Sequence, residues 1–118
     1  MNQTTVSMNV RLVTAETGII DIQGEITAAA ENILMDAYSE ATKAGTQNIV
    51  LNFNDLEYMN SSGIGLLVTL LIRTQRQKQH LFACGLSSHY QQIFELTRLN
   101  EAILIYPDEQ AALAAVKK

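Results

Sequence analysis

Residue types that mark secreted or membrane-bound chains are scarce in this sequence. It has one cysteine, Cys84, and a single cysteine cannot form an internal disulfide, so we expect a reducing, cytoplasmic setting. The longest apolar run, residues 64–72, is interrupted by Gly65 and Thr69 and is far shorter than the roughly 20 residues that cross a bilayer. The N-terminus has no basic flank followed by an apolar core. We therefore expect neither a signal peptide nor membrane insertion.

Positive charge is also scarce, and it is nowhere concentrated. The chain has 8 Lys and Arg against 12 Asp and Glu, which gives a formal net charge of −4. Proteins that bind nucleic acid or an anionic membrane surface usually present a cluster of basic residues, so we expect neither kind of partner. The only two histidines, His80 and His89, are too far apart to suggest a metal site. No metal ion or other cofactor is expected.

The rest of the composition is that of a compact domain. With 118 residues, 47% hydrophobic side chains and one proline, the chain is expected to form one domain over residues 1–118. Apolar residues alternate in strand-like segments and recur at helical spacing between them. The pattern predicts two strands within residues 8–27 that turn at 16–18, further strands over 48–53, 80–85 and 102–107, and helices over 28–45, 62–78, 87–99 and 108–118.

The predicted order, β-β-α-β-α-β-α-β-α, indicates an α/β fold with a mixed, mostly parallel sheet of about five strands and four helices. Strands separated by helical crossovers are expected to be parallel, and the first two strands, joined by a tight turn, to be antiparallel. If the strands follow one another in the sheet, all crossover helices fall on one face. Gly24 is expected to end the second strand, Thr27 and Asp108 to cap helices, and Gly45 to follow a helix end.

The helix over residues 62–78 is apolar on more than one side. At 100° per residue, the expected core face comprises Ile64, Leu67, Val68 and Leu71. Leu66 then falls within the polar side, and Leu70 lies on its edge. These two leucines either belong to a helix that is largely buried or form part of a docking patch beside the preceding serines.

The stretch DLEYMNSSGIGLL, residues 55–67, places Ser61 and Ser62 between a turn-rich segment and this helix. Three roles are open for them. A serine there can cap the helix by accepting a backbone N–H hydrogen bond. It can be a nucleophile, although that needs an activating base and the surroundings do not fit the Gly-x-Ser-x-Gly elbow of hydrolases. It can be a phosphorylation switch, because the start of a helix favours added negative charge.

Three segments resemble the STAS family, and specifically its small stand-alone anti-sigma factor antagonists. Residues 24–27, GEIT, resemble the family's Gly-Glu-Leu-Asp at the end of the second strand. Residues 48–67 resemble its strand, its Asp-Leu loop and its Asp-Ser-Ser-Gly-Leu-Gly phosphorylation motif. Residues 84–113 resemble its final strand–helix–strand–helix portion. Together the segments cover nearly the whole chain in matching order and spacing.

The resemblance implies a non-enzymatic anti-sigma factor antagonist. In the family, the unphosphorylated antagonist binds an anti-sigma factor Ser/Thr kinase and frees the sigma factor, the kinase phosphorylates the motif serine, and a phosphatase restores it. By position, the phosphorylated residue here is Ser61. The resemblance and the helix pattern together suggest as partner-binding residues Asn60, Ser61, Ser62, Gly63, Ile64, Gly65, Leu66, Leu70 and Thr27. Gly63 and Gly65 would let the partner backbone approach closely.

Two positions depart from the family pattern. Asn60 replaces the motif Asp, and Thr27 replaces the Asp of Gly-Glu-Leu-Asp. Asn keeps the size of Asp but lacks its charge, so any help that a carboxylate gives to phosphorylation is lost. A second hypothesis is therefore a STAS scaffold, or a subunit of a signalling or transport assembly, without a phosphate cycle. A third, from another class, is a small hydrolase that uses Ser61. The sequence leaves the oligomeric state open.

Overall fold

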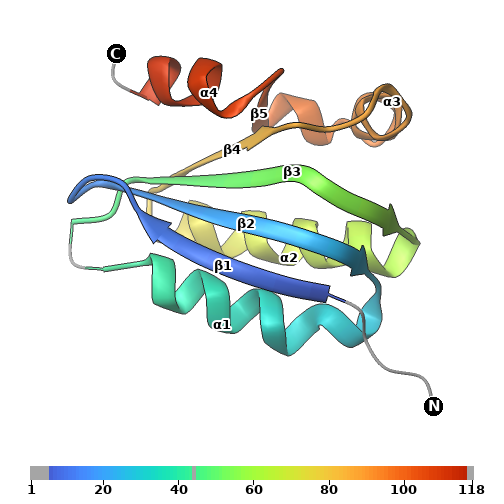
Figure 1. The fold of residues 1–118 in the computed structure, drawn as a ribbon, viewed down its shortest axis with the longest axis horizontal. Helices are drawn as coiled ribbons and strands as arrows, with labels where there is room; N and C mark the ends of the chain where they lie inside the picture. The colour runs from blue at the N-terminus through green and yellow to red at the C-terminus, as the bar shows by residue number, and fades with distance from the viewer. Residues whose placement is uncertain (1–5, 44, 117–118) are drawn as a thin grey trace.

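The computed structural model describes residues 6–43 and 45–116, which form five strands and four α-helices with two short 3-10 turns. Figure 1 shows the arrangement. In chain order the elements are β1 (Val6–Leu12), β2 (Thr17–Ile26), η1 (Ala28–Ala30), α1 (Glu31–Ala41), β3 (Asn48–Met59), α2 (Ser61–Arg76), β4 (His80–Cys84), α3 (Ser88–Leu96), η2 (Leu99–Glu101), β5 (Ile103–Tyr106) and α4 (Glu109–Val116).

The five strands lie in one sheet in the order β1-β2-β3-β4-β5. β1 and β2 are antiparallel, and the other neighbouring pairs are parallel. The predicted α/β class, element order and strand directions are therefore confirmed. The tight turn between β1 and β2 falls slightly earlier than expected, because Thr17 and Gly18 already belong to β2 and Gly18 pairs with Leu12.

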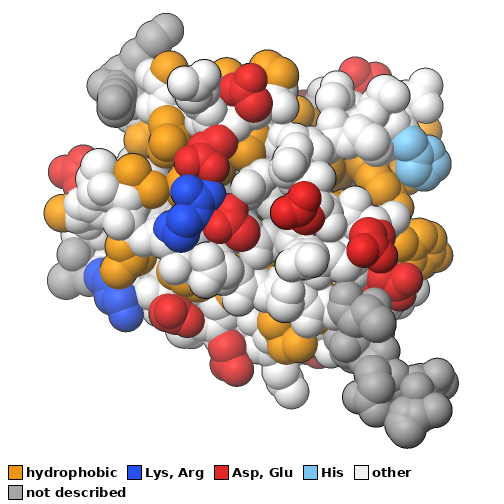
Figure 2. All heavy atoms as spheres, in the orientation of Figure 1, with side chains coloured by type: hydrophobic (Ala, Val, Ile, Leu, Met, Phe, Trp, Pro, Cys, Tyr) orange, Lys and Arg blue, Asp and Glu red, His pale blue; other side chains and the backbone are white. Residues whose placement is uncertain are grey.

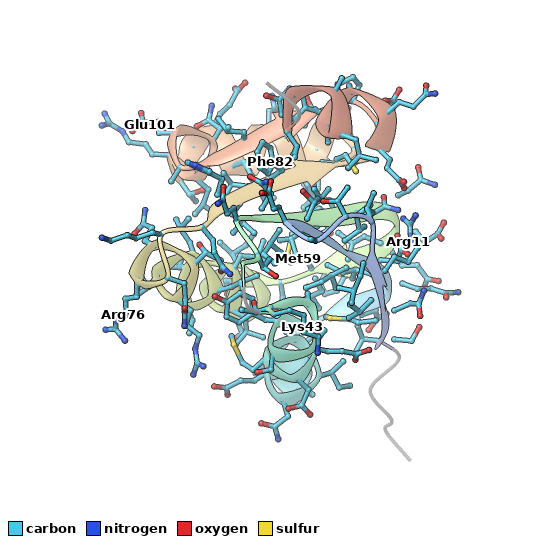
Figure 3. All side chains as sticks on the ribbon, turned by 90° about the vertical axis from the view of Figure 1, so that its left-hand side faces the viewer. Arg11, Lys43, Met59, Arg76, Phe82 and Glu101 are labelled. Atoms are coloured by element: carbon cyan, nitrogen blue, oxygen red, sulfur yellow. The ribbon has the colours of Figure 1, made fainter. Side chains whose placement is uncertain are left out.

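Helices cover both faces of the sheet. The larger core lies between one face and side chains of α1, α2 and α3, which include Leu34, Leu67 and Phe94. The three crossover helices thus share a face, as expected for strands in sequential order. The last helix, α4, packs on the opposite face over a smaller cluster that includes Phe82 and Ala112. Figure 1 shows α1 and α2 across the sheet from α4, and Figure 3 shows Phe82 on the α4 side.

An ion-pair cluster fastens α4 to the sheet. Arg11 Nε on β1 lies 2.6 Å from Asp21 Oδ2 on β2, and Arg11 Nη2 lies 2.7 Å from Glu109 Oε1 at the start of α4. The hydrogen bond from Arg11 lowers the pKa of the Asp21 carboxyl. Asp108 Oδ1 accepts a hydrogen bond from the Ala111 N–H at 2.9 Å, so the predicted cap of this helix is confirmed. The lysines at 117 and 118 lie outside the described residues.

β2 and β3 are both longer than predicted. The segment 54–59, expected to be a loop, is the second half of β3, and Gly24 is inside β2 instead of at its end. Gln23 pairs with Asp55 and Ile26 pairs with Met59, with register shifts near Gly24, whose φ is +99°. Pairing with β2 compensates for the turn-prone side chains of this segment, a long-range effect that local propensity does not report.

The first helix also differs in detail from its prediction. Thr27 Oγ1 accepts a hydrogen bond from the Ala29 N–H at 3.3 Å, but the segment that it caps is η1, which leads into α1. The helix ends at Ala41, and Thr42 is its C-terminal cap residue in an extended conformation. Gly45 therefore lies in the following connection, with φ +93°, and does not terminate the helix.

Charge and hydropathy in the structure agree with the composition. Over the described ranges 6–43 and 45–116, no helix combines the length and apolar character needed to cross a membrane. The face shown in Figure 2 carries more acidic than basic side chains, among many uncharged atoms. No basic patch covers the described part of that face, which agrees with the net charge of −4.

Cys84 is fully buried at the end of β4, as its apolar sequence context predicted. Burial, and then the nearby carboxylates of Glu109, Asp108 and Asp21, raises the pKa of its thiol from 9.0 to about 11. The thiolate is the form that reacts with alkylating reagents. The structure therefore assigns Cys84 a packing role, in agreement with the sequence.

We expect iodoacetamide to alkylate Cys84 at least roughly 10-fold more slowly in the folded protein than in urea at the same mildly alkaline pH. Burial raises the pKa of the thiol to about 11, so little thiolate forms in the folded protein, and burial also hinders access of the reagent. Intact mass measured over time gives both rates, and Cys84→Ser supplies the unlabelled control. Equal rates in the two conditions would contradict the burial of this residue.

Candidate functional site

The candidate site lies where β3 ends and α2 begins. Asn60 stands between them in an extended conformation, and its side-chain Oδ1 accepts a hydrogen bond from the Gly63 N–H at 2.9 Å. Its backbone carbonyl accepts one from the Ile64 N–H at 3.0 Å. Asn60 is therefore the N-cap residue of α2. The helix begins at Ser61, one residue earlier than predicted.

This geometry answers one question about the two serines. Because Asn60 supplies the cap, the first of the three roles left open for the serines, capping of the helix, is wrong. Ser61 and Ser62 occupy the first two positions of α2, and both are exposed. Within residues 6–43 and 45–116, neither serine hydroxyl forms a hydrogen bond, and the Ser61 and Ser62 N–H groups have no acceptor. Both hydroxyls are thus available to a partner or an enzyme.

Thr27 is brought close to the serines by strand pairing. Ile26 pairs with Met59, and the Asn60 N–H donates a hydrogen bond to the Ile26 carbonyl at 3.3 Å. Thr27 therefore lies next to Asn60, although 33 positions separate them in the sequence. The two departures from the family motif meet at one place, and both residues serve as caps, Thr27 for η1 and Asn60 for α2.

The two motif glycines have different environments. Gly63 is buried against β2, and a Cβ atom there would lie 2.2 Å from the Ile26 carbonyl oxygen. Its predicted role, to admit the backbone of a partner, is wrong because the Ile26 backbone already occupies that space. Gly65 is exposed, and nothing lies within 4 Å of where its Cβ would be. Only Gly65 is open to a partner.

The predicted orientation of α2 is only partly correct. Of the expected core face, Leu67 is buried and Ile64 and Leu71 are half-buried against the core. The buried residues of α2, however, are Gly63, Leu66, Leu67, Leu70 and Thr74. Leu66 and Leu70, proposed as partner contacts, are only 9% and 0% exposed, so they cannot form a docking patch. Val68, placed in the core, is 39% exposed. The close approach of Gly63 to Ile26 sets this rotation, which the apolar periodicity of the helix could not define.

The exposed side of α2 carries a different apolar stripe. Ser61, Gly65, Val68 and Ile72 recur at i, i+4, i+7 and i+11, so they lie in line along the helix. Val68 and Ile72 are 39% and 44% exposed, and Ile64 beside them is half-buried. We call Ser61, Gly65, Val68 and Ile72 the α2 stripe. Sequence reasoning missed it, although the helical spacing counted from Ser61 would have indicated it.

The fold and this site define a small mixed-sheet domain that presents a serine at the exposed start of a helix. The family model of the STAS domain matches residues 9–112, and the chain belongs to this family. Among curated proteins, it is 27% identical over 82 residues to an anti-sigma-B factor antagonist of Staphylococcus aureus. That alignment covers 70% of this chain and 76% of the relative.

Solved structures show the same fold. The anti-sigma factor antagonist SpoIIAA in its unphosphorylated form matches with a TM-score of 0.74 and 21% identity, over 94% of this chain and 98% of that one. Its phosphorylated form, from Bacillus, gives 0.72 and 23%, over 93% and 99%. An anti-sigma factor antagonist from Mycobacterium paratuberculosis gives 0.80 and 18%, over 99% and 98%.

Proposed function

We propose that this protein is an anti-sigma factor antagonist that binds an anti-sigma factor kinase and is released when Ser61 is phosphorylated. The main support is the position of Ser61: it is exposed at the first position of α2, and its hydroxyl is free because Asn60 provides the cap. The names of the relatives support the same function. In this proposal the protein acts by regulated binding and not by catalysis.

The start of α2 can accept a phosphate without rearrangement. Unpaired N–H groups and the positive end of the helix dipole favour a dianion there. Asn60 is neutral, so it adds no repulsion to the phosphate, as an Asp at this position would. The Asn60 cap uses Oδ1 and the Gly63 N–H, neither of which belongs to Ser61. We therefore expect phosphorylation to change the surface of the protein and to leave its fold intact.

We assign the α2 stripe as part of the partner-binding surface. It begins at Ser61 and continues with two exposed apolar side chains, Val68 and Ile72, that the protein does not bury itself. α2 contains no acidic residue, and Arg73 and Arg76 lie in its last turn. The corresponding surface of the anti-sigma factor would be apolar opposite the stripe and acidic beyond it. Phosphate on Ser61 would stand at one end of this contact and would be desolvated by it.

Val68→Asp and Ile72→Asp are each expected to weaken binding of the anti-sigma factor by about 10-fold or more, because each buries a charge in the contact. The free energy of unfolding should change little, since both positions are at the surface. Leu96→Asp is the matched control, because Leu96 is an exposed leucine on α3, 83% accessible and outside the α2 stripe. Calorimetric titration measures the affinities. Equal affinity for all three variants would contradict this assignment.

The proposed switch is tested by incubating the protein with its cognate anti-sigma factor and ATP. Intact mass should show one added phosphate, Ser61→Ala should abolish it, and Ser62→Ala should retain it. A pull-down with the phosphorylated and unphosphorylated forms should recover the anti-sigma factor only with the latter. Phosphate on another residue, or recovery that is equal for both forms, would refute the switch. Treatment with a cognate phosphatase should restore binding.

A STAS scaffold without a phosphate cycle is the second candidate, and one observation favours it. The neutral residues Thr27 and Asn60 lie side by side where the family motif has carboxylates, so no acid from these positions can assist the kinase. In that case the same incubation leaves Ser61 unmodified, while a partner still binds the α2 stripe. A covalent serine probe separates both candidates from a hydrolase, because only an activated Ser61 would react with it.

A further inference from the structure

The geometry points to Tyr90 as the positioning residue of the switch: its hydroxyl holds the backbone before Ser61 in place and so sets how readily Ser61 is phosphorylated. Tyr90 lies in the first turn of α3, 29 positions after Ser61 in the sequence. It is 9% exposed and does not belong to the α2 stripe. This inference rests on the proposed function and names a residue that regulates the same site from inside the protein.

The later part of β3 needs a partner such as Tyr90 because β3 extends beyond β4. The pairing of β3 with β4 ends at Asn52 and Cys84, but β3 continues to Met59. On that side, no strand of the described residues lies beside the later part of β3, and side chains of α3 cover it instead. Phe53 packs edge-to-face against Phe94, with ring centroids 6.4 Å apart. Farther along, the Met59 N–H donates a hydrogen bond to the Tyr90 hydroxyl at 2.8 Å.

The backbone before Ser61 is therefore held from two sides. The Met59 N–H is bound by Tyr90, and the next N–H, of Asn60, is bound by the Ile26 carbonyl on β2 at 3.3 Å. Met59 is buried and belongs to the larger core, together with Leu34, Leu67 and Phe94. Of these two contacts, only the one with Tyr90 comes from a side chain. Its strength can thus be changed without altering a strand.

Loss of the Tyr90 hydroxyl should loosen the segment that carries the cap. Phe in its place would fill the same space, but the buried Met59 N–H would have no acceptor, which is unfavourable. Asn60, the next residue, would then hold the Gly63 N–H less firmly, and the Ser61 hydroxyl would take up several positions. A poorly placed reacting group slows the chemical step. Binding through other residues of the surface is affected less, so we expect a larger change in kcat than in KM.

The test compares Tyr90→Phe with Tyr38→Phe. Tyr38 is a matched control, because it is a buried tyrosine on α1 whose hydroxyl also makes one side-chain-specific hydrogen bond, to Gln79 Oε1 at 2.6 Å, beyond the other end of α2. In Tyr90→Phe, exchange of the hydrogen-bonded amides of residues 59, 60 and 63 should accelerate about 10- to 100-fold, and kcat for phosphorylation of Ser61 by the cognate kinase should fall about 10-fold. KM should stay within about twofold, because Gly65, Val68 and Ile72 of the α2 stripe are unchanged.

Tyr38→Phe should leave exchange at residues 59, 60 and 63 and kcat near the wild-type values, even if it lowers the free energy of unfolding as much as Tyr90→Phe does. Equal effects of the two variants on these measurements would overturn the role of Tyr90. An unmodified wild-type protein would instead refute the proposed phosphorylation. In that event, the hydrogen-exchange comparison still decides whether Tyr90 positions the segment, so the two failures are distinguishable.

Discussion

Ser61→Asp is expected to weaken binding of the anti-sigma factor by roughly 100-fold while the protein remains folded and as stable as wild type. A carboxylate at the first position of α2 is favoured by the helix dipole by about 0.3–1 kcal/mol. In the complex, the same charge would lie against the partner with no counter-charge. An unpaired charge buried in this way costs about 3 kcal/mol or more, which corresponds to the expected loss of affinity.

Ser61→Asn is the matched control for this experiment, because Asn has the size of Asp and no charge. Its affinity should lie close to that of the wild-type protein. Calorimetric titration with the cognate anti-sigma factor and urea unfolding of each variant provide the two measurements. If Asn weakens binding as much as Asp does, size and not charge is responsible, and the phosphate switch loses its physical basis. Unchanged affinity of Ser61→Asp would have the same consequence.

Gly63→Ala is expected to lower the free energy of unfolding by about 3 kcal/mol. The added methyl carbon would lie 2.2 Å from the Ile26 carbonyl oxygen and 2.9 Å from Met59 Cγ. The Met59 side chain can move, but the Ile26 carbonyl belongs to β2 and cannot, so the start of α2 must shift. Overpacking of this kind costs typically about 1–3 kcal/mol, and a contact with rigid backbone lies at the upper end. Urea unfolding followed by circular dichroism measures the change.

For Gly65→Ala, two residues away on the same helix, we expect the opposite change in the free energy of unfolding. Nothing lies within 4 Å of the position of its Cβ, so the substitution should stabilise the protein by up to about 1 kcal/mol through helix propensity. Because Gly65 lies in the α2 stripe, the same variant also reports on the partner. A loss of affinity without a loss of stability would place the partner backbone against Gly65. Two variants of equal stability would contradict the packing of Gly63 against β2.

Local signals explain what could be predicted about the fold. Alternation of apolar residues, helical spacing and cap residues act over a few positions, so they indicated the order of the elements and the Asp108 cap. The same signals failed for residues 54–59. Asp, Asn and Glu there favour a turn, but hydrogen bonds to β2 keep the segment extended as far as Met59. The wrong boundary of α2 followed from that error, because the loop was expected to reach the serines.

By itself, the sequence determined that a serine pair lies at the start of an apolar helix, and that the chain resembles the STAS family over nearly its whole length. Only the tertiary structure decided which sides of that helix are buried, because α2 is apolar on several sides and periodicity leaves its rotation open. The contact of Gly63 with Ile26 settles the rotation, turns Leu66 inward and exposes Val68. The bond from Met59 to Tyr90 joins residues 31 positions apart, so no local pattern could have predicted it.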